Sequence, residues 1–142
     1  MALVYFDSSA FVKLVVEEDG TDLAVELWDG CDAAFSSRIA YPEVRAALAA
    51  AARNHDLDPA GLSAAKRAWA RYWPAVRPVE LTAAVERLAG DLSERHRLRG
   101  ADAVHLASAL SLGDGGLLVA TWDRRLGDGV VGAGLALTPS SS

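Results

Sequence analysis

The chain has 142 residues, 51% of them hydrophobic, which predicts one globular domain with its own core and excludes a largely disordered protein. Its net charge of −5 argues against a general nucleic-acid binder, which is typically basic, unless the acidic residues gather in one place. A single cysteine, no long apolar run and no signal-peptide pattern exclude an internal disulfide, and they predict a cytoplasmic protein without membrane contact.

Strands and helices are expected to alternate. In chain order, the pattern predicts a strand at 3–6, helices at 9–17 and 21–28, a strand at 33–36, helices at 38–54 and 59–72, a strand at 76–81, helices at 83–98 and 101–112, and strands at 117–121 and 135–138. Pro78 cannot donate a ladder hydrogen bond, so 76–81 is expected at a sheet edge. The alternation predicts an α/β fold with a mainly parallel sheet of four or five strands, covered by helices on both faces.

No linker or internal repeat divides the sequence. We therefore expect residues 1–138 to form a single domain, with residues 139–142 as a frayed C-terminal tail.

Four acidic residues stand at the ends of predicted elements: Asp7, Glu43, Asp102 and Asp123. Asp7 follows the first strand, where Asp7-Ser8-Ser9 can also cap a helix, and Asp123 follows the strand at 117–121 by two residues. Ligands of parallel sheets gather outside the carboxyl ends of the strands, so these two acids are expected at one edge. Glu43 and Asp102 fall near helix starts, where an acid alone would also suit the helix dipole.

The helix around Asp102 has an apolar stripe made by Ala103, Leu106, Ala107 and Leu110. Asp102 lies just beside that stripe, on the strip that carries His105. The acid is therefore expected at the border between the core and a cleft, where a metal ligand or general base is half desolvated but accessible. His105 fits either a packed core histidine or a group that contacts the acids without contacting the metal.

At these residues the sequence resembles a known family. Asp7-Ser8-Ser9-Ala10 after a first strand is similar to the opening of the PIN-domain nucleases, and Pro42-Glu43-Val44 resembles their helix-borne glutamate. The segment from Leu98 to Ala109, LRGADAVHLASA, is very similar to the signature of the VapC-type toxins. Thr121-Trp122-Asp123 resembles their closing motif. The resemblance spans residues 3 to 138, and the segment around Asp102 is its most specific part.

The resemblance implies a PIN-like three-layer α/β/α fold and a metal-dependent endoribonuclease, the toxin of a type II toxin–antitoxin pair. It implies Asp7 and Asp102 as the main ligands of Mg²⁺ or Mn²⁺, with Glu43 and Asp123 completing the acidic pocket, partly through waters. Thr121 would orient an acid or a water. A VapB-type antitoxin is the implied protein partner and RNA the substrate. We expect a homodimer, and transfer, ribosomal and messenger RNA all stay open as substrates.

Three other interpretations fit less well or receive less support. Phosphatases with an aspartyl nucleophile need a second acid two residues after the first, where this chain has Ser9. Receiver domains need a lysine after their last strand, and no lysine follows Lys66. A PIN-fold module that binds RNA or protein without toxin activity remains the alternative, and metal binding distinguishes it from a nuclease.

Overall fold

Five parallel strands form the central sheet of the computed structural model, which describes residues 1–140. The strands are β1 (Leu3–Phe6), β2 (Ala33–Ser37), β3 (Arg77–Val79), β4 (Leu118–Ala120) and β5 (Ala136–Thr138). Their order across the sheet is β3-β2-β1-β4-β5, and all four neighbouring pairs are parallel. The predicted α/β fold is confirmed, as is the edge position of the strand that contains Pro78.

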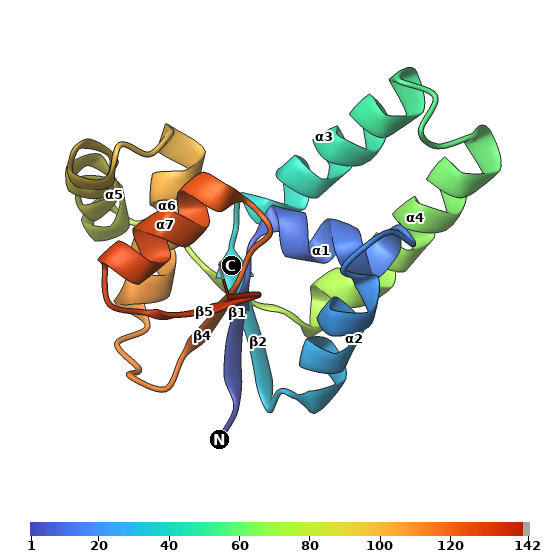
Figure 1. Cartoon of the computed structure of the whole chain (residues 1–142). Coiled ribbons are helices and arrows are strands. Elements are labelled where there is room, and N and C mark those ends of the chain that lie inside the picture. The colour runs from blue at the N-terminus through green and yellow to red at the C-terminus, as the bar shows by residue number, and fades with distance from the viewer. Residues whose placement is uncertain (141–142) are drawn as a thin grey trace.

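Helices cover both faces of the sheet, which gives the three-layer arrangement (Figure 1). The helices are α1 (Ser8–Val15), α2 (Thr21–Gly30), α3 (Ala40–Arg53), α4 (Pro59–Tyr72), the short 3₁₀ helix η1 (Trp73–Ala75), α5 (Ala83–His96), α6 (Gly100–Ser111) and α7 (Arg124–Gly132). Helices α1 to α4 lie on one side of the sheet, and α5, α6 and α7 lie on the other. No helix within the described residues is both long and apolar enough to cross a membrane.

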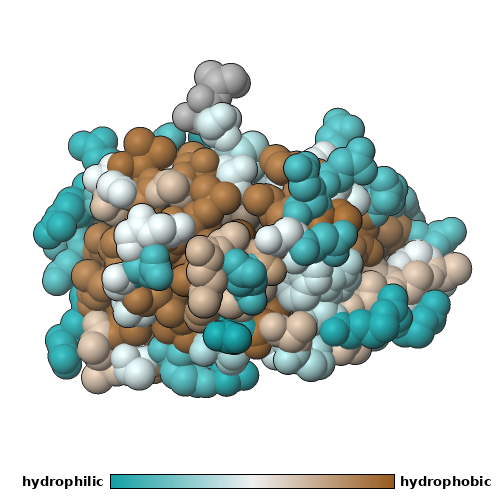
Figure 2. All heavy atoms as spheres, turned by 90° about the horizontal axis from the view of Figure 1, so that it is seen from below, coloured by the Kyte–Doolittle hydropathy of each residue, from teal (hydrophilic) through white to brown (hydrophobic). Residues whose placement is uncertain are grey.

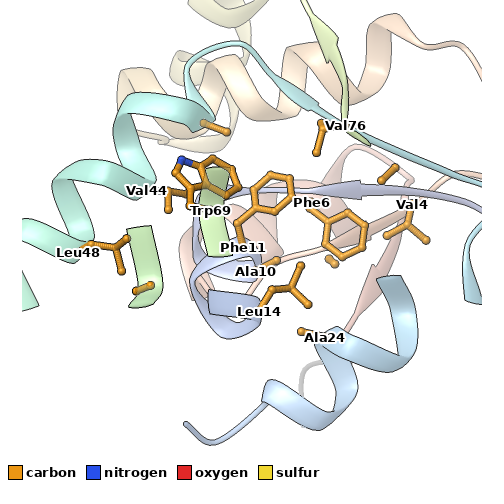
Figure 3. Packing of buried hydrophobic residues seen from close by; sticks show 14 residues of the cluster. Val4, Phe6, Ala10, Phe11, Leu14, Ala24, Val44, Leu48, Trp69 and Val76 are labelled. Carbon is orange, nitrogen blue, oxygen red and sulfur yellow. The ribbon is translucent and has the colours of Figure 1, made fainter. Parts of the chain in front are cut away.

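Two hydrophobic clusters, one on each face, hold these layers together. Successive side chains of a strand point to opposite faces, so the cluster beside α1 receives Val4 and Phe6 while the cluster beside α6 receives Tyr5. In the first cluster Phe11 lies between Phe6 and Trp69 (Figure 3), at centroid distances of 5.5 and 4.9 Å. Burial on both faces explains why β1 is apolar throughout.

Two helical segments were missing from the sequence prediction: α7 and the short η1. The glycines of residues 124–132 suggest a loop, yet they fit a helix that packs closely on its neighbours. A Cβ atom at Gly129 would lie 3.1 Å from the Leu98 side chain, so a larger residue would require that side chain to shift. The Asp123 side chain accepts a hydrogen bond from the Leu126 amide and thereby caps the helix.

Most predicted elements end within two or three residues of their observed bounds. The helix expected at 83–98 ends at His96, because Arg97 adopts a left-handed backbone conformation with φ of 54°. Gly100 begins α6, one residue before the start expected at 101. Residues 141 and 142 of the predicted C-terminal tail lie outside the described residues.

The parallel arrangement brings the carboxyl ends of all five strands to one edge of the sheet. Asp7 follows β1 directly, and Asp123 follows β4 after two further residues. Figure 2 views the opposite face, at the amino ends of the strands, where hydrophobic residues gather on the side of α5, α6 and α7. The carboxyl edge is where the four predicted acids are expected to gather.

Replacing Phe11 by alanine should lower the free energy of unfolding by about 3–5 kcal/mol, because the ring is fully buried between Phe6 and Trp69. Urea unfolding of both proteins measures the difference. The exposed Val131 provides the control, since its change to alanine should cost at most about 0.5 kcal/mol. Equal losses in the two variants would contradict this account of the core.

Candidate active site

Asp7 is held at the junction of β1 and α1 by three hydrogen bonds. Its Oδ1 accepts from the Ser9 hydroxyl at 2.7 Å and from the Ala10 amide at 3.0 Å, and its Oδ2 accepts from the Thr121 hydroxyl at 2.6 Å. The residue is only 3% exposed. Burial raises the pKa of this carboxyl, and the nearby His105 and the three hydrogen bonds oppose that rise.

Thr121 and Ser9 connect Asp7 to the segment that follows β4. The Thr121 hydroxyl donates to Asp7 and accepts from the Asp123 amide at 3.0 Å, while the Ser9 hydroxyl accepts from the Trp122 amide at 2.9 Å. The hydrogen bond to Asp7 is the contact through which Thr121 would orient that buried carboxylate. The contacts of Thr121 with Asp7 and of Trp122 with Ser9 join residues more than a hundred positions apart in the chain.

Glu43 lies in the first turn of α3, and Pro42 is tolerated beside it because the first turn needs no amide donor there. Its Oε1 lies 2.6 Å from Nε2 of His105, which is itself 2% exposed. The other ring nitrogen of His105 lies 2.8 Å from the Tyr5 hydroxyl. His105 therefore fits both interpretations that the sequence left open. It is a buried residue of α6, and it directly contacts the acid Glu43.

Asp102 is half-buried in the first turn of α6. Desolvation raises the pKa of its carboxyl, and the negative charges of Asp123, Asp7 and Glu43 raise it further, whereas His105 lowers it. The structure thus brings the other three predicted acids within electrostatic reach of Asp102. Asp123 is the exposed member, and its Oδ1 also caps α7.

A divalent cation fits the chemistry of these side chains. Carboxylate oxygens are the ligands that Mg²⁺ prefers. Neighbouring carboxylates raise one another's pKa, and a shared cation stabilises their charged forms. Among the described residues, however, no three His, Cys, Asp or Glu side chains are gathered closely enough to hold a metal ion between them. The arrangement therefore suits an ion held by one or two carboxylates with waters in the other positions, as is usual for Mg²⁺.

Ser9 and Tyr5 contact the site but were not singled out as site residues from the sequence. Ser9 belongs to the Asp7-Ser8-Ser9 cap, and a serine two residues after an acid at a helix start is a recognisable signal for a side-chain contact. Tyr5 had no such signal, because an aromatic residue in a buried strand is ordinarily part of the core. Only the packing of α6 on β1 places its hydroxyl against His105.

The sequence also matches known proteins along nearly its whole length. The pattern of the family described as PIN domain covers residues 4–128. Ribonuclease VapC49 of Mycobacterium tuberculosis is 66% identical over 140 residues, which span 99% of this chain and 97% of that protein.

Two solved structures share the fold. VapC20 of Mycobacterium tuberculosis, a toxin that cleaves the sarcin–ricin loop, superimposes with a TM-score of 0.68 at 20% identity over 94% of this chain and 96% of that one. A chain from a toxin–antitoxin complex of Klebsiella pneumoniae gives a TM-score of 0.63 at 19% identity, with both chains fully covered.

The raised pKa of Asp102 predicts how stability depends on pH without divalent cations. The folded protein holds this proton more tightly than the unfolded chain, so the associated stability is present at low pH and lost as pH rises through the raised pKa. Asp102→Asn should therefore reduce the fall in unfolding free energy between about pH 4 and pH 8, and should stabilise the protein at neutral pH. Urea unfolding in EDTA across that range measures both effects.

The exposed Asp91 of α5 provides the matched control, because it lies outside the acidic site. Asp91→Asn should leave the pH dependence as it is in the wild type. If Asp102→Asn behaves like Asp91→Asn, the repulsion among the acids does not limit the stability of the fold.

Proposed function

The chain belongs to the PIN domain family, and within it to the VapC ribonucleases, and on this premise we propose that it is a Mg²⁺- or Mn²⁺-dependent endoribonuclease, the toxin of a type II toxin–antitoxin pair. The observation that carries the proposal is the influence of three carboxylates, those of Asp7, Glu43 and Asp123, on the carboxyl of Asp102 at the carboxyl edge of the sheet. Such a concentration of negative charge suits the binding of a metal ion, which can in turn bind the phosphodiester of a substrate.

Asp7 and Asp102 would hold the metal directly, since the first is fixed in place and the second is half-buried beside the other acids. Glu43 and Asp123 would complete the pocket through waters. A bound Mg²⁺ or Mn²⁺ would lower the pKa of a water and offset the negative charge on the phosphate.

The chain's own residues supply orientation and proton acceptance. The water oxygen would form a bond to phosphorus while the bond from phosphorus to the 3′ oxygen breaks, which leaves a 5′-phosphate and a 3′-hydroxyl. Glu43 or Asp123 would accept the proton of the attacking water, and the leaving 3′ oxygen would receive a proton from solvent. Thr121 and Ser9 would keep both oxygens of Asp7 in their positions while the charges change.

Purified protein should cut total cellular RNA into discrete fragments when Mg²⁺ or Mn²⁺ is present, and EDTA should stop the reaction. Asp7→Asn and Asp102→Asn should each lower the rate at least about 100-fold, because metal-ion catalysis supplies several kcal/mol of the barrier reduction. Gel analysis of total RNA measures the rates, and mapping of the fragment ends identifies both the substrate and the bond that breaks.

The control is Asp91→Asn, which removes an acid of α5 away from the site and should leave the rate unchanged. Fragments that form equally well in EDTA would contradict the metal requirement. Folded wild-type protein that cleaves no RNA would instead favour a PIN-fold binding module without toxin activity.

We also propose that a VapB-type antitoxin binds this chain through a basic segment. The net charge of −5 and the acidic site favour a positively charged partner, which would place an arginine against the carboxylates. An arginine-containing peptide from the C-terminal part of the cognate antitoxin should therefore slow cleavage, and added Mn²⁺ should partly restore it. The same peptide with alanine in place of arginine is the control. Full cleavage by the antitoxin-bound protein would contradict the proposal.

A homodimer is the third proposal, based on the resemblance to VapC-type toxins. Analytical ultracentrifugation should give twice the mass of one chain. A monomer at the concentrations used for the RNA assay would contradict it.

A further inference from the structure

Three side chains from three separate elements are hydrogen-bonded in a row that ends at one acid of the site. Tyr5 comes from β1, His105 from α6 and Glu43 from α3. The Tyr5 hydroxyl lies 2.8 Å from His105 Nδ1, and His105 Nε2 lies 2.6 Å from Glu43 Oε1. The rings of Tyr5 and His105 meet edge to face, with centroids 5.8 Å apart. Two of these elements also carry acids of the site, Asp7 directly after β1 and Asp102 in the first turn of α6.

The direction of these hydrogen bonds follows from the chemistry of the groups. An ionised carboxylate only accepts, so the proton between His105 and Glu43 belongs to Nε2. The Tyr5 hydroxyl can donate to Nδ1 of a neutral ring or accept from Nδ1 of a protonated ring. Tyr5 therefore fixes the plane of the imidazole in either state, and the ring presents its Nε2–H to Glu43 in both.

The other acids are fixed differently. Asp7 is held by three hydrogen bonds, and Asp123 accepts one from the Leu126 amide of its own helix. Glu43 has a longer side chain that is 29% exposed, so it has more rotamers to lose. Within the described residues, its carboxylate receives its hydrogen bond from His105 through Oε1. Oε2 is thereby left for a water or an ion.

We propose that His105 is a positioning residue, which fixes the Glu43 carboxylate at the acidic site and is itself oriented by Tyr5. Its effect on cleavage rests on the proposed nuclease function, whereas its effect on the position of Glu43 does not. A fixed Glu43 holds one oxygen toward the reacting water, so its side chain has no conformational freedom to lose in each turnover. His105 acts through Glu43 and is expected to make no contact with the substrate.

Crystal structures of three proteins test the position of Glu43 directly. In the wild type and in His105→Gln, which can keep a side-chain N–H donor, Glu43 should be ordered with Oε1 on that donor. In His105→Leu, which fills the space without a donor, the Glu43 side chain should take several rotamers. Leu106→Val is the matched control, because it disturbs the packing of the neighbouring buried residue of α6 and should leave Glu43 ordered.

The kinetic test uses an RNA oligonucleotide that spans the cleavage site mapped in total RNA. His105→Leu should lower kcat about 10- to 100-fold with little change in KM, which is the usual effect of losing a group that orients an active-site ligand. His105→Gln should recover most of the loss. Tyr5→Phe should lower kcat in the same direction but by less, and it keeps the test available if His105→Leu does not fold.

A double-mutant comparison separates positioning from a general structural effect. If His105 acts through Glu43, then His105→Leu should cause no further loss in a Glu43→Ala background. An equal loss in both backgrounds would overturn the proposal, and so would an ordered, unmoved Glu43 in the His105→Leu crystal. If the wild type cleaves no RNA, the nuclease function fails, and the crystal structures still decide whether His105 positions Glu43.

Discussion

The carboxylate of Asp7 lies at the end of β1 with the residue almost fully buried, and its charge has to be accommodated there. An isolated buried carboxylate would take up a proton, and burial does raise the pKa of Asp7. Three hydrogen bonds oppose this, two from the start of α1 and one from Thr121 after β4. The hydrogen bonding of the Asp7 carboxylate therefore depends on the parallel pairing of β1 with β4, which brings residues 7 and 121 together.

The same edge collects Glu43, Asp102 and Asp123, and the charges of Asp123, Asp7 and Glu43 all act on Asp102. This arrangement is unfavourable for a protein without a cation, because the other three carboxylates make the ionisation of Asp102 more difficult. The cost is understandable if the site binds a divalent ion, since concentrated negative charge is what a hard cation requires. His105 lies among these acids, contacts Glu43, and lowers the pKa of both Asp7 and Asp102.

Much of this was predictable from the sequence because the strongest signals are local. The apolar run before Asp7 indicates a strand, and Asp7-Ser8-Ser9 indicates the cap that the Ala10 amide completes. The helix α7 was missed because the packing at its glycines, such as the approach of Gly129 to Leu98, joins distant segments of the chain. The same limit applies to the site. The positions of the four acids follow from strand and helix ends, whereas the pairing of His105 with Tyr5 and Glu43 requires the packing of α6 on β1 and α3.

The central proposal is that Asp7 and Asp102, beside Glu43 and Asp123, bind a divalent cation, and a calorimetric titration of the folded protein with Mn²⁺ tests it most directly. The account predicts that the wild type and Asp91→Asn bind Mn²⁺ alike, and that Asp7→Asn and Asp102→Asn each weaken binding at least about 10-fold. Thermal unfolding of the same samples would show that the variants are folded. Equal Mn²⁺ affinity in all four proteins, or no binding by the wild type, would contradict the claim.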